Sequence, residues 1–466
     1  MVSLNIFRIL VYISIIYFLI INITYITLNI IAFFSLKRGK VKYEITDLKK
    51  AFQSEFYKPL SIIVPAYNEE LTITESVSSM LSLEYPEFEV VVVNDGSKDG
   101  TLQRLKEKFN LVKSSRTYKG KLETEKIKGV YDSLDYPNLV VVDKENGGKA
   151  DSLNAGINVA YFPLVCNIDA DSLIESDALL RLVEPFVEDR RVVAAGGTIR
   201  IANDCQVEDG KIIQVNLAKS WLARFQIIEY LRAFLFGRVG WAAIEGLLII
   251  SGAFGIFRKS HLISVGGYSK DTIGEDMELV LKLNRMLKEQ DREYRTVFLP
   301  DPVCWTQVPE SLKTLGRQRR RWQQGLGQSL LMNKGLLFNR EYGAVGLLAY
   351  PFFLFGEFFG PVIELIGYIS IVITIVFGIA TLELVLAFFA VSILLRILLS
   401  TISVIFEEIS FRKYDKLTDN LKLLITAVLE SFGYQQLHTY WRLQGIFDLL
   451  KKREIWGEQE RKEFNK

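Results

Sequence analysis

The sequence predicts an α/β fold in which a mostly parallel β-sheet domain is flanked by membrane-spanning helices. Between about residues 59 and 339, short β-branched segments alternate with amphipathic stretches, and long uncharged apolar segments lie on either side. Hydrophobic residues make up 49% of the 466 positions and the mean hydropathy is +0.19, which is more apolar than an ordinary soluble protein. Charged residues still make up 24%, which excludes a chain that lies in the membrane throughout.

The first apolar segment, Ile9–Leu36, is uncharged and longer than the roughly 20 residues that a helix needs to cross a bilayer. A signal peptide would have a shorter apolar core and a small-residue cleavage site. Four basic residues between positions 37 and 42 follow at once, so the positive-inside rule places the N-terminus outside the cell. We predict a transmembrane anchor over 1–36 and a cytoplasmic linker over 37–58.

The middle of the chain carries the pattern of βαβ units. Five apolar runs are predicted as strands: Leu60–Val64, Val90–Asn94, Leu139–Asp143, Leu164–Ile168 and Val192–Ala195. Most are bounded by Gly, Pro, Asn or Asp, and helical pattern lies between them, which is typical of a mostly parallel sheet buried on both faces. The polar, lysine-rich stretch 106–128 is predicted to be a surface excursion at the sheet edge.

The chain is apolar again after residue 342. Four membrane spans are predicted, at 344–366, 367–382, 384–406 and 421–440. They would form a bundle over 342–442 and leave a cytoplasmic tail over 443–466, giving a multi-pass protein of the cell membrane. Glu357 and Glu364 lie inside this apolar region, where they either line a polar path or lie in a segment at the membrane surface.

Composition excludes several other functions. The net charge of +2 gives no sign of nucleic-acid binding. Cys166, Cys205 and Cys304 have no metal-binding spacing and suit reduced thiols. Only two histidines occur, His261 and His438, which disfavours a zinc site or a histidine base.

Polar residues follow the ends of the first two predicted strands, where ligands bind in open α/β sheets. Tyr67 and Glu69 follow the first strand, and Asp95 follows the second, just before a glycine turn. A carboxylate at such a turn can accept hydrogen bonds from a nucleobase imide. A plain turn with a helix N-cap would use the same residue types.

Two further patterns offer charges of opposite sign. The glycines before Lys149 allow close backbone approach, and the lysine itself would bring positive charge near a phosphate or base, unless it is simply solvated. Asp169 and Asp171 follow a predicted strand, and alternation along its end would place both on one side. Converging carboxylates suit Mg²⁺ or Mn²⁺ on a diphosphate. Capping of a helix from Leu173 onward is the alternative.

The last patterns lie on predicted helices. Glu275 and Asp276 open one, where acidic residues also favour the helix dipole. The arginine-rich segment 317–321, with Trp322, offers guanidinium donors for phosphate beside an aromatic face for a sugar ring. A basic amphipathic helix on the membrane surface is a second interpretation, compatible with the first.

Six motifs occur in one order along the chain: Pro-Ala-Tyr-Asn-Glu (65–69), Asn-Asp-Gly-Ser (94–97), Gly-Lys-Ala (148–150), Asp-Ala-Asp (169–171), Gly-Glu-Asp (274–276) and Gln-x-x-Arg-Trp (318–322). This series resembles the processive inverting glycosyltransferases of family 2, which include poly-N-acetylglucosamine, cellulose, hyaluronan and chitin synthases. The resemblance covers about residues 60–335. It implies a GT-A-like catalytic domain over 59–341, cytoplasmic, with interfacial helices toward its C-terminal end.

The resemblance also implies roles for the motif residues. The uridine part of a UDP-sugar would be held by Tyr67, Glu69, Asp95 and Lys149, and Mg²⁺ or Mn²⁺ on the donor by Asp169 and Asp171, with Asp171 the more direct ligand. The catalytic pair would be Glu275 and Asp276, with Asp276 the general base. The diphosphate would be gripped by Gln318 and Arg321, and the acceptor would be contacted by Trp322, Ser251 and Gly252. Ser251 and Gly274 depart from the cellulose synthase pattern, which weakens a glucose-only interpretation. The predicted sugar is N-acetylglucosamine or glucose.

The implied reaction is a single displacement, in which the acceptor hydroxyl gives its proton to Asp276 while UDP leaves on a metal and arginine clamp. An α-linked donor then gives a β-linked polysaccharide, which we expect to be translocated across the bilayer. Two alternatives stay open: a glycolipid synthase that adds one sugar to a membrane lipid, and a non-catalytic scaffold, which the intact acidic motifs disfavour. Accessory subunits are left open.

Overall fold

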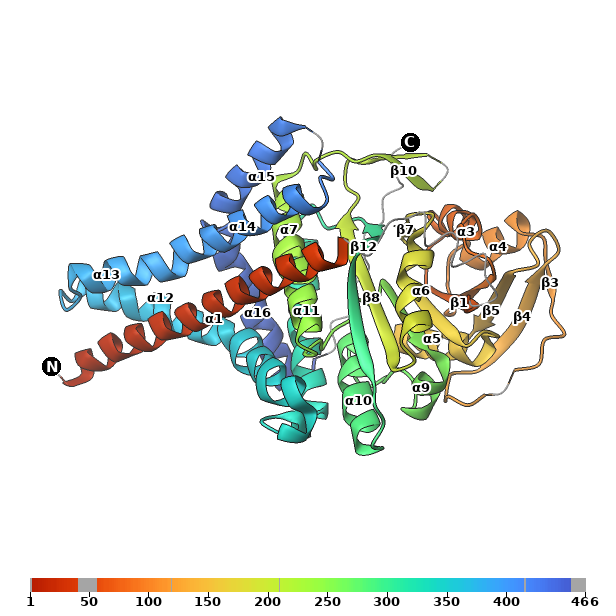
Figure 1. Ribbon diagram of the computed structural model, residues 1–466, viewed down its shortest axis with the longest axis horizontal. Helices are drawn as coiled ribbons and strands as arrows, with labels where there is room; N and C mark the ends of the chain where they lie inside the picture. The colour runs from red at the N-terminus through yellow and green to blue at the C-terminus, as the bar shows by residue number, and fades with distance from the viewer. Residues whose placement is uncertain (1, 41–56, 119, 209, 415, 454–466) are drawn as a thin grey trace. The chain divides into compact units, whose positions relative to one another are not determined.

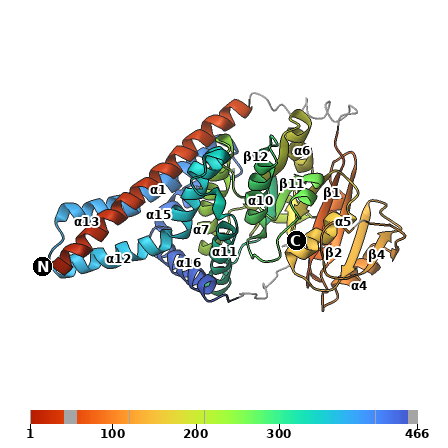
Figure 2. The same cartoon turned by 90° about the horizontal axis from the view of Figure 1, so that it is seen from below.

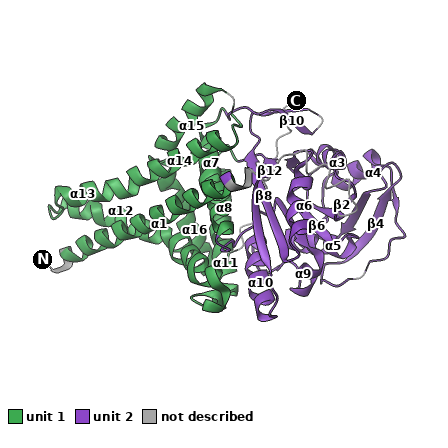
Figure 3. Ribbon diagram, viewed as in Figure 1, with its two compact units in different colours: residues 1–36, 219–243, 309–457 green, residues 37–218, 244–308, 458–466 purple. Residues whose placement is uncertain are grey.

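The structure is a computed structural model, and the residues it describes are 2–40, 57–118, 120–208, 210–414 and 416–453. Most of the predicted linker and the end of the predicted tail lie outside these residues. The described residues fall into two compact units (Figure 3). The helical unit holds those within 1–36, 219–243 and 309–457, and the sheet unit holds those within 37–218 and 244–308.

The sheet unit is built on ten strands, several of which are labelled in Figure 1. They are β1 (Leu60–Ala66), β2 (Phe88–Asn94), β3 (Leu111–Lys113), β4 (Ile127–Ser133), β5 (Leu139–Lys144), β6 (Leu164–Ile168), β7 (Ser172–Ile174), β8 (Val192–Ile201), β11 (Phe254–Arg258) and β12 (Arg295–Thr306). Their order is β3-β4-β5-β2-β1-β6-β11-β8-β12-β7. A separate two-stranded sheet pairs β9 (Gln206–Glu208) with β10 (Lys211–Gln214).

All five predicted strands are present, as β1, β2, β5, β6 and β8. The central strands β5-β2-β1-β6 are parallel, and Ala66, Asn94 and Asp143 lie level across three of them. Strands β3, β4, β7 and β11 pair antiparallel with their neighbours, so the sheet is mixed outside its parallel centre. The parallel centre brings the turns that follow its strands to one edge.

The predicted excursion over 106–128 is wrong in part. Its first residues belong to helix α4 (Thr101–Lys108), and the segment then forms the edge strand β3. This strand, Leu111–Lys113, pairs with β4 over only three residues, and its side chains are half-buried or exposed. A short edge strand that ends in a lysine resists pairing with other chains.

Helices connect the strands: α3 (Ile73–Leu81), α4, α5 (Lys149–Val159), α6 (Ala178–Glu188), α9 (Lys259–Ser264) and α10 (Glu275–Glu289). Helix α5 packs on β1 and β2, and the lack of a side chain at Gly156 permits this, since a Cβ there would lie 2.4 Å from Ile63 Cγ2. That close packing fixes the N-terminus of α5, where Lys149 begins the helix, near the edge at which the parallel strands end.

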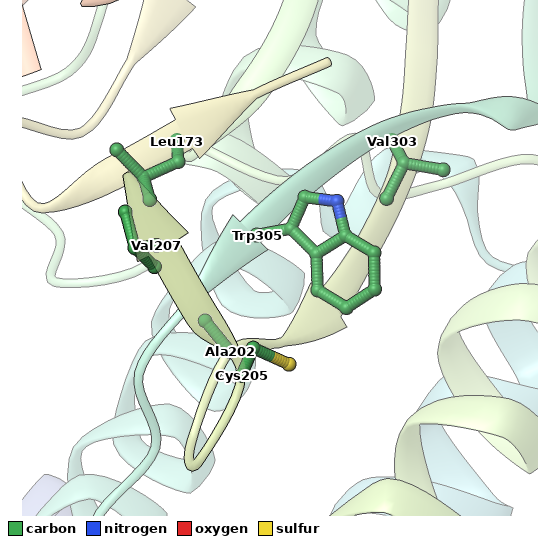
Figure 4. Packing of buried hydrophobic residues seen from close by; sticks show 6 residues of the cluster. All are labelled: Leu173, Ala202, Cys205, Val207, Val303 and Trp305. Carbon is green, nitrogen blue, oxygen red and sulfur yellow. The ribbon is translucent and has the colours of Figure 1, made fainter. Parts of the chain in front are cut away.

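A second part of the sheet-unit core surrounds Trp305 on β12 (Figure 4). Leu173 on β7, Val303 on β12 and Cys205 pack in the same cluster, and Trp305 is 1% exposed. Burying an apolar side chain of this size contributes roughly 2 kcal/mol. The cluster therefore anchors β7, the strand that directly follows the Asp-Ala-Asp motif. All three cysteines are buried free thiols.

The helical unit contains α1 (Val2–Lys40, through residue 36), α7 (Trp221–Glu229), η1 (Tyr230–Gly237), α8 (Arg238–Ala243), α11 (Leu312–Met332), η2 (Lys334–Leu336), η3 (Arg340–Tyr342), η4 (Val345–Ala349), η5 (Phe352–Phe358), α12 (Gly360–Val376), α13 (Leu382–Phe389), η6 (Ala390–Leu394), α14 (Leu395–Ser410), α15 (Leu417–Leu429) and α16 (Tyr434–Leu450). Helix α1 runs beside α12 and α13 in both views (Figures 1 and 2). Phe18 of α1 packs against Ile371 and Phe388 in that contact.

Two helices among the described residues are long and apolar enough to cross a membrane, Asn5–Lys37 and Leu382–Ser410. A third span would be the pair Val345–Phe358 and Gly360–Val376, which is bent by 45° at its break. The predicted boundary between 366 and 367 is therefore wrong, since it falls inside α12. The predicted span 421–440 is interrupted between α15 and α16, where Gly433 adopts a φ of 92°. Hydropathy alone does not detect such breaks.

The two carboxylates in the apolar region after residue 342 are paired with arginines of other helices. Glu357 lies 3.0 Å from Arg442 on α16, and Glu364 lies 3.5 Å from Arg396 on α14. Thr439 also donates to Glu364 at 2.5 Å. A carboxylate in an apolar region is costly unless it is paired and hydrogen-bonded, so these pairs account for both residues without a position in lipid.

Candidate active site

The turns after β1 and β2 are joined by hydrogen bonds. The Asn68 backbone N–H donates to Ser97 Oγ at 3.0 Å, and Asn68 Oδ1 accepts from the Lys98 N–H at 2.9 Å. Asn68 has a φ of 55°, a conformation that Asn tolerates better than most residues. The Glu69 N–H donates to Thr101 Oγ1 at 2.9 Å. These bonds hold the first two motifs as one rigid group at the sheet edge.

Within this group, Tyr67 and Glu69 are placed differently. The Tyr67 side chain is 43% exposed and open to a ligand, whereas Glu69 is buried and accepts a hydrogen bond from Thr72 Oγ1 at 3.0 Å. Glu69 therefore braces the turn that leads into α3. Its predicted contact with a nucleoside stays a prediction.

Asp95 is bound by the loop that precedes α5. Its carboxylate accepts from the backbone N–H groups of Gly147 at 3.0 Å and Gly148 at 2.8 Å, and from Asn146 Nδ2 at 3.2 Å. Gly148 has a φ of 86°, which explains glycine at this position. A Cβ at Gly96 would lie 2.8 Å from the Asn146 nitrogen, so the two loops touch. Asp95 thus shapes the loop that carries Lys149.

Lys144 is a residue that the sequence reasoning missed. Its ammonium lies 2.5 Å from Asp95 Oδ1 and 2.7 Å from Asp151 Oδ1, and all three side chains are buried. Lys270 reaches the other oxygen of Asp151 at 3.0 Å. Burial would raise the pKa of Asp151, but the bonds from Lys144 and Lys270 outweigh it and hold this pKa below its ordinary value. The sequence does show a charged residue at the end of a buried strand, and a buried charge requires ion-pair or hydrogen-bond partners. That pattern could have identified Lys144.

Three predicted motifs meet around Lys149. Its ammonium lies 2.5 Å from Asp169 Oδ1 and 3.8 Å from Glu275 Oε1. Asp276 lies beside Glu275 on the first turn of α10, and its Oδ2 accepts from the Gly252 N–H at 3.2 Å. A Cβ at Gly252 would come within 3.2 Å of the Lys149 ammonium. The structure thus brings together the predicted lysine, metal, base and acceptor positions.

The electrostatics of this cluster follow from its composition. Burial alone would lower the pKa of Lys149, but the carboxylates of Asp169, Glu275 and Asp276 reverse this and raise it above its ordinary value. The lysine therefore stays charged. About a third of the Lys149 and Asp169 side chains is exposed, so both remain accessible to a ligand.

The local structure predicted for the Asp-Ala-Asp motif is wrong. Asp169 and Asp171 lie in a turn between β6 and β7, closed by a bond from the Ser172 N–H to the Asp169 carbonyl at 3.0 Å. Strand alternation therefore does not determine where these side chains point. The alternative interpretation, a helix from Leu173 onward, is excluded, because Ser172–Ile174 is a strand that pairs with β12.

The arginine-rich motif lies on α11 in the helical unit, and its arginines differ in their partners. Arg319 is 1% exposed, lies 2.8 Å from Glu229, and its guanidinium lies 4.2 Å from the centre of the Trp322 ring. Arg320 lies 2.7 Å from Asp448. Arg321 makes no ion pair with any residue that the structure describes, and it is partly exposed. Arg321 is therefore available for an anion, whereas Arg319 and Arg320 hold the helices together.

Gln318 and Trp322 of the same motif, and Ser251 of the predicted acceptor site, also have contacts in the structure. Gln318 Oε1 accepts from Arg319 at 3.3 Å, and the Trp322 ring lies 5.7 Å from that of Phe234. One face of the indole is thus covered by the Arg319 guanidinium, a favourable cation–π contact. Ser251 lies two residues before Ala253, whose N–H donates to Ser251 Oγ at 3.4 Å.

This fold and site define a class of protein, namely a GT-A-like glycosyltransferase with flanking apolar helices. The chain is similar in fold to a mannosyltransferase, PcManGT of Pyrobaculum calidifontis, whose structure was solved with GDP-Man and Mn²⁺. The TM-score is 0.52 at 17% sequence identity, over 95% of this chain and 100% of the other. The likeness confirms the predicted fold class.

Family models place the chain more closely. A model described as glycosyl transferase family 2 matches residues 61–261, and one described as glycosyl transferase family group 2 matches residues 164–403, more than half of the chain. The chain belongs to the family 2 glycosyltransferases, as its motif series predicts.

Curated relatives are similar over the same part of the chain. A poly-β-1,6-N-acetyl-D-glucosamine synthase of Staphylococcus epidermidis is 32% identical over 273 residues, and one of Staphylococcus aureus is 31% identical over 275 residues. Each alignment covers 58% of this chain and 55% of the relative. The chain thus matches about half the length of these relatives.

Proposed function

We propose that this chain transfers N-acetylglucosamine from UDP-N-acetylglucosamine to a growing β-linked polysaccharide at the cell membrane. The observation that carries the proposal is the cluster of Lys149, Asp169, Glu275 and Asp276 beside Gly252. The names of the staphylococcal relatives support the choice of sugar and of a polymeric product. Because these relatives are matched over only about half of their length, the sugar and the polymeric product are both part of the proposal.

Asp276 is the proposed general base. Its Oδ2 accepts from the Gly252 N–H, and its Oδ1 accepts from the Met277 N–H at 2.8 Å, so backbone donors hold the carboxylate in one orientation. An acceptor hydroxyl beside Gly252 would give its proton to this carboxylate as its oxygen attacks the anomeric carbon. The bond from the anomeric carbon to the diphosphate breaks on the opposite face, which inverts the configuration. Glu275 lies on the same turn and contributes charge near Lys149.

The donor set at Asp169 and Asp171 fits a divalent ion, Mg²⁺ or Mn²⁺. An ammonium already lies 2.5 Å from Asp169, so the turn accommodates a cation. Mg²⁺ is usually held by one or two carboxylates, with phosphate and water as its other ligands. The described residues contain no group of three or more metal-ligating side chains, which suits an ion that arrives with the diphosphate. When bound, it would neutralise the departing UDP.

The remaining roles follow the family pattern. Tyr67 is exposed and suits a nucleobase, while Asp95 and Glu69 act by holding the turns that would bind the uridine. On α11, Arg321 and Gln318 are proposed to bind the diphosphate, and Trp322 the acceptor sugar. The absence of a carboxylate partner for Arg321 among the described residues supports its role, since guanidinium groups bind phosphate oxygens well.

The helices that are long and apolar enough to cross a membrane support a multi-pass membrane protein. The basic residues between positions 37 and 42 support an N-terminus outside the cell and a cytoplasmic sheet unit. Translocation of the product is part of the same proposal.

The proposal is tested by incubating membranes that contain the protein with each UDP-sugar in turn and digesting the product with specific glycosidases. Incorporation from UDP-N-acetylglucosamine into material cleaved only by a β-N-acetylglucosaminidase is expected. Preferred incorporation of another sugar would overturn the choice of donor, and a single sugar on a lipid would favour a glycolipid synthase.

A further inference from the structure

Lys149 lies within the acidic cluster, with about a third of its side chain exposed. Its ammonium lies within ion-pair distance of Asp169 and Glu275, and a Cβ added at Gly252 would approach both this ammonium and the side chain of Asp276. These carboxylates come from the turn after β6 and from the first turn of α10. Negative charges so close together repel one another, and a cation among them reduces this repulsion.

The ammonium lies beside the carboxylate that a divalent ion would bind. A Mg²⁺ ion binds carboxylate oxygens at about 2.0–2.1 Å, so an ion on Asp169 and an ammonium at 2.5 Å from the same carboxylate would lie about 4 Å apart and repel each other. Lys149 has a flexible four-carbon stem and a side chain about one-third exposed, so the ammonium can leave without unfolding α5.

We propose that Lys149 is a tethered counter-ion, which occupies the acidic cluster before the donor arrives and makes divalent-ion binding depend on the nucleotide. The inference rests on the proposed function, since it requires a metal at Asp169 and Asp171. When a metal–nucleotide complex enters, the ion replaces the ammonium at Asp169, and the freed Lys149 pairs with the added negative charge of the diphosphate. One cation is thus exchanged for another, and the cluster is never left without a positive charge.

The charge of Lys149 should weaken metal binding when no nucleotide is present. In the wild-type protein the ion must either bind against the charge of Lys149 or displace an ammonium that then has no phosphate to pair with, so binding should be weak. Even at the dielectric constant of bulk water, repulsion between a unit charge and a divalent ion about 4 Å apart corresponds to more than about tenfold in affinity. Removing the lysine charge should therefore tighten nucleotide-free binding by about tenfold or more.

The test is a Mn²⁺ titration of the full-length protein in detergent, followed by the electron paramagnetic resonance signal of free Mn²⁺, with and without UDP. Lys149→Met removes the charge and keeps the apolar stem, and Lys149→Arg keeps a charge. Lys128→Met is a matched control, because it removes an exposed lysine of β4 in the same unit. Thermal unfolding of each variant checks that it is folded.

Without UDP, Lys149→Met is expected to bind Mn²⁺ at least about tenfold more tightly than wild type, while Lys149→Arg and Lys128→Met resemble wild type. With UDP, the difference should shrink or reverse, because the variant lacks the partner of the diphosphate. Equal nucleotide-free affinity in Lys149→Met and wild type would overturn the counter-ion role alone. Failure of the wild type to bind Mn²⁺ even with UDP would instead overturn the metal site of the proposed function, and the counter-ion role with it.

Discussion

Asp276 is the residue on which the proposed chemistry depends most. Its carboxylate is held by the Gly252 and Met277 N–H groups and has no role in the hydrophobic core. Asp276→Asn keeps the shape of the side chain but cannot accept the proton of the acceptor hydroxyl. Transfer should fall by about 10² to 10⁴, the usual contribution of a general base, while UDP affinity stays near normal. Steady-state assays and UDP titration of the same preparation measure both.

A loss of less than about a hundredfold in Asp276→Asn would contradict the assignment of the base. Glu275→Gln is the comparison variant, because Glu275 lies on the same turn and nearer to Lys149. If Glu275→Gln lowered transfer by about a hundredfold or more and Asp276→Asn did not, the base would be Glu275.

Sequence reasoning found the residues of this cluster, but not how each one is used. Asp169, Glu275 and Asp276 could be found because each is a polar residue next to a strand or helix end in a recognised order. The role of Asp95 in holding the Gly147–Gly148 loop could not be read from the sequence, nor could its shared bond with Lys144. Both depend on how loops distant in sequence approach each other across the sheet.

At the scale of elements, the segment before α10 is fixed from two sides. On α5, Asn154 bonds both the N–H and the carbonyl of Tyr268, and Asp151 pairs with Lys270. On α10, Lys282 donates to the Gly267 carbonyl at 2.6 Å. Helix α5 thus links the loop shaped by Asp95 to the segment that leads into Glu275 and Asp276.

Lys270→Met tests this link without leaving a buried charge unpaired, because Asp151 keeps Lys144. Lys270 itself is partly exposed and the buried Asp151 keeps an ammonium partner, so the protein should remain folded. We expect kcat to fall severalfold with little change in the KM for the donor, and Lys270→Arg to restore it. If both kinetic constants match wild type while only the unfolding temperature falls, the pair stabilises the fold and does not position the catalytic turn.

Helix α11 allows a separate test of processivity. An aromatic face can hold a sugar without demanding one pattern of hydroxyl groups, and such contacts are favourable by roughly 1 kcal/mol. Trp322→Ala should therefore shorten the polymer and reduce its yield while UDP binding survives. Normal polymer length and normal specific activity in a well-folded Trp322→Ala protein would make the indole a packing partner of Arg319 only.

The elements themselves show where hydropathy patterns fail. All five predicted strands formed, because each is a β-branched run bounded by turn residues. The Asp-Ala-Asp turn and the bend before α12 were not predicted, since one depends on a backbone bond and the other on the break between η5 and α12. Apolar composition alone cannot reveal either feature.

At the scale of the whole molecule, membrane topology can be measured with one introduced cysteine. The three native cysteines are buried, so a membrane-impermeant maleimide should report on the new one. Ser115 is exposed in the sheet unit, and Ser115→Cys should be labelled only after intact cells are permeabilised. Labelling of intact cells would contradict a cytoplasmic sheet unit. An unmodified protein under the same conditions gives the background signal.

The proposed function requires that this chain itself polymerises N-acetylglucosamine. The most direct measurement is the length distribution of the product that purified protein in lipid nanodiscs makes from labelled UDP-N-acetylglucosamine and Mn²⁺, with Asp276→Asn as the inactive control. Wild-type protein is expected to make long β-linked chains, and the variant none. Products of a single sugar on lipid, or equal product from Asp276→Asn, would contradict it.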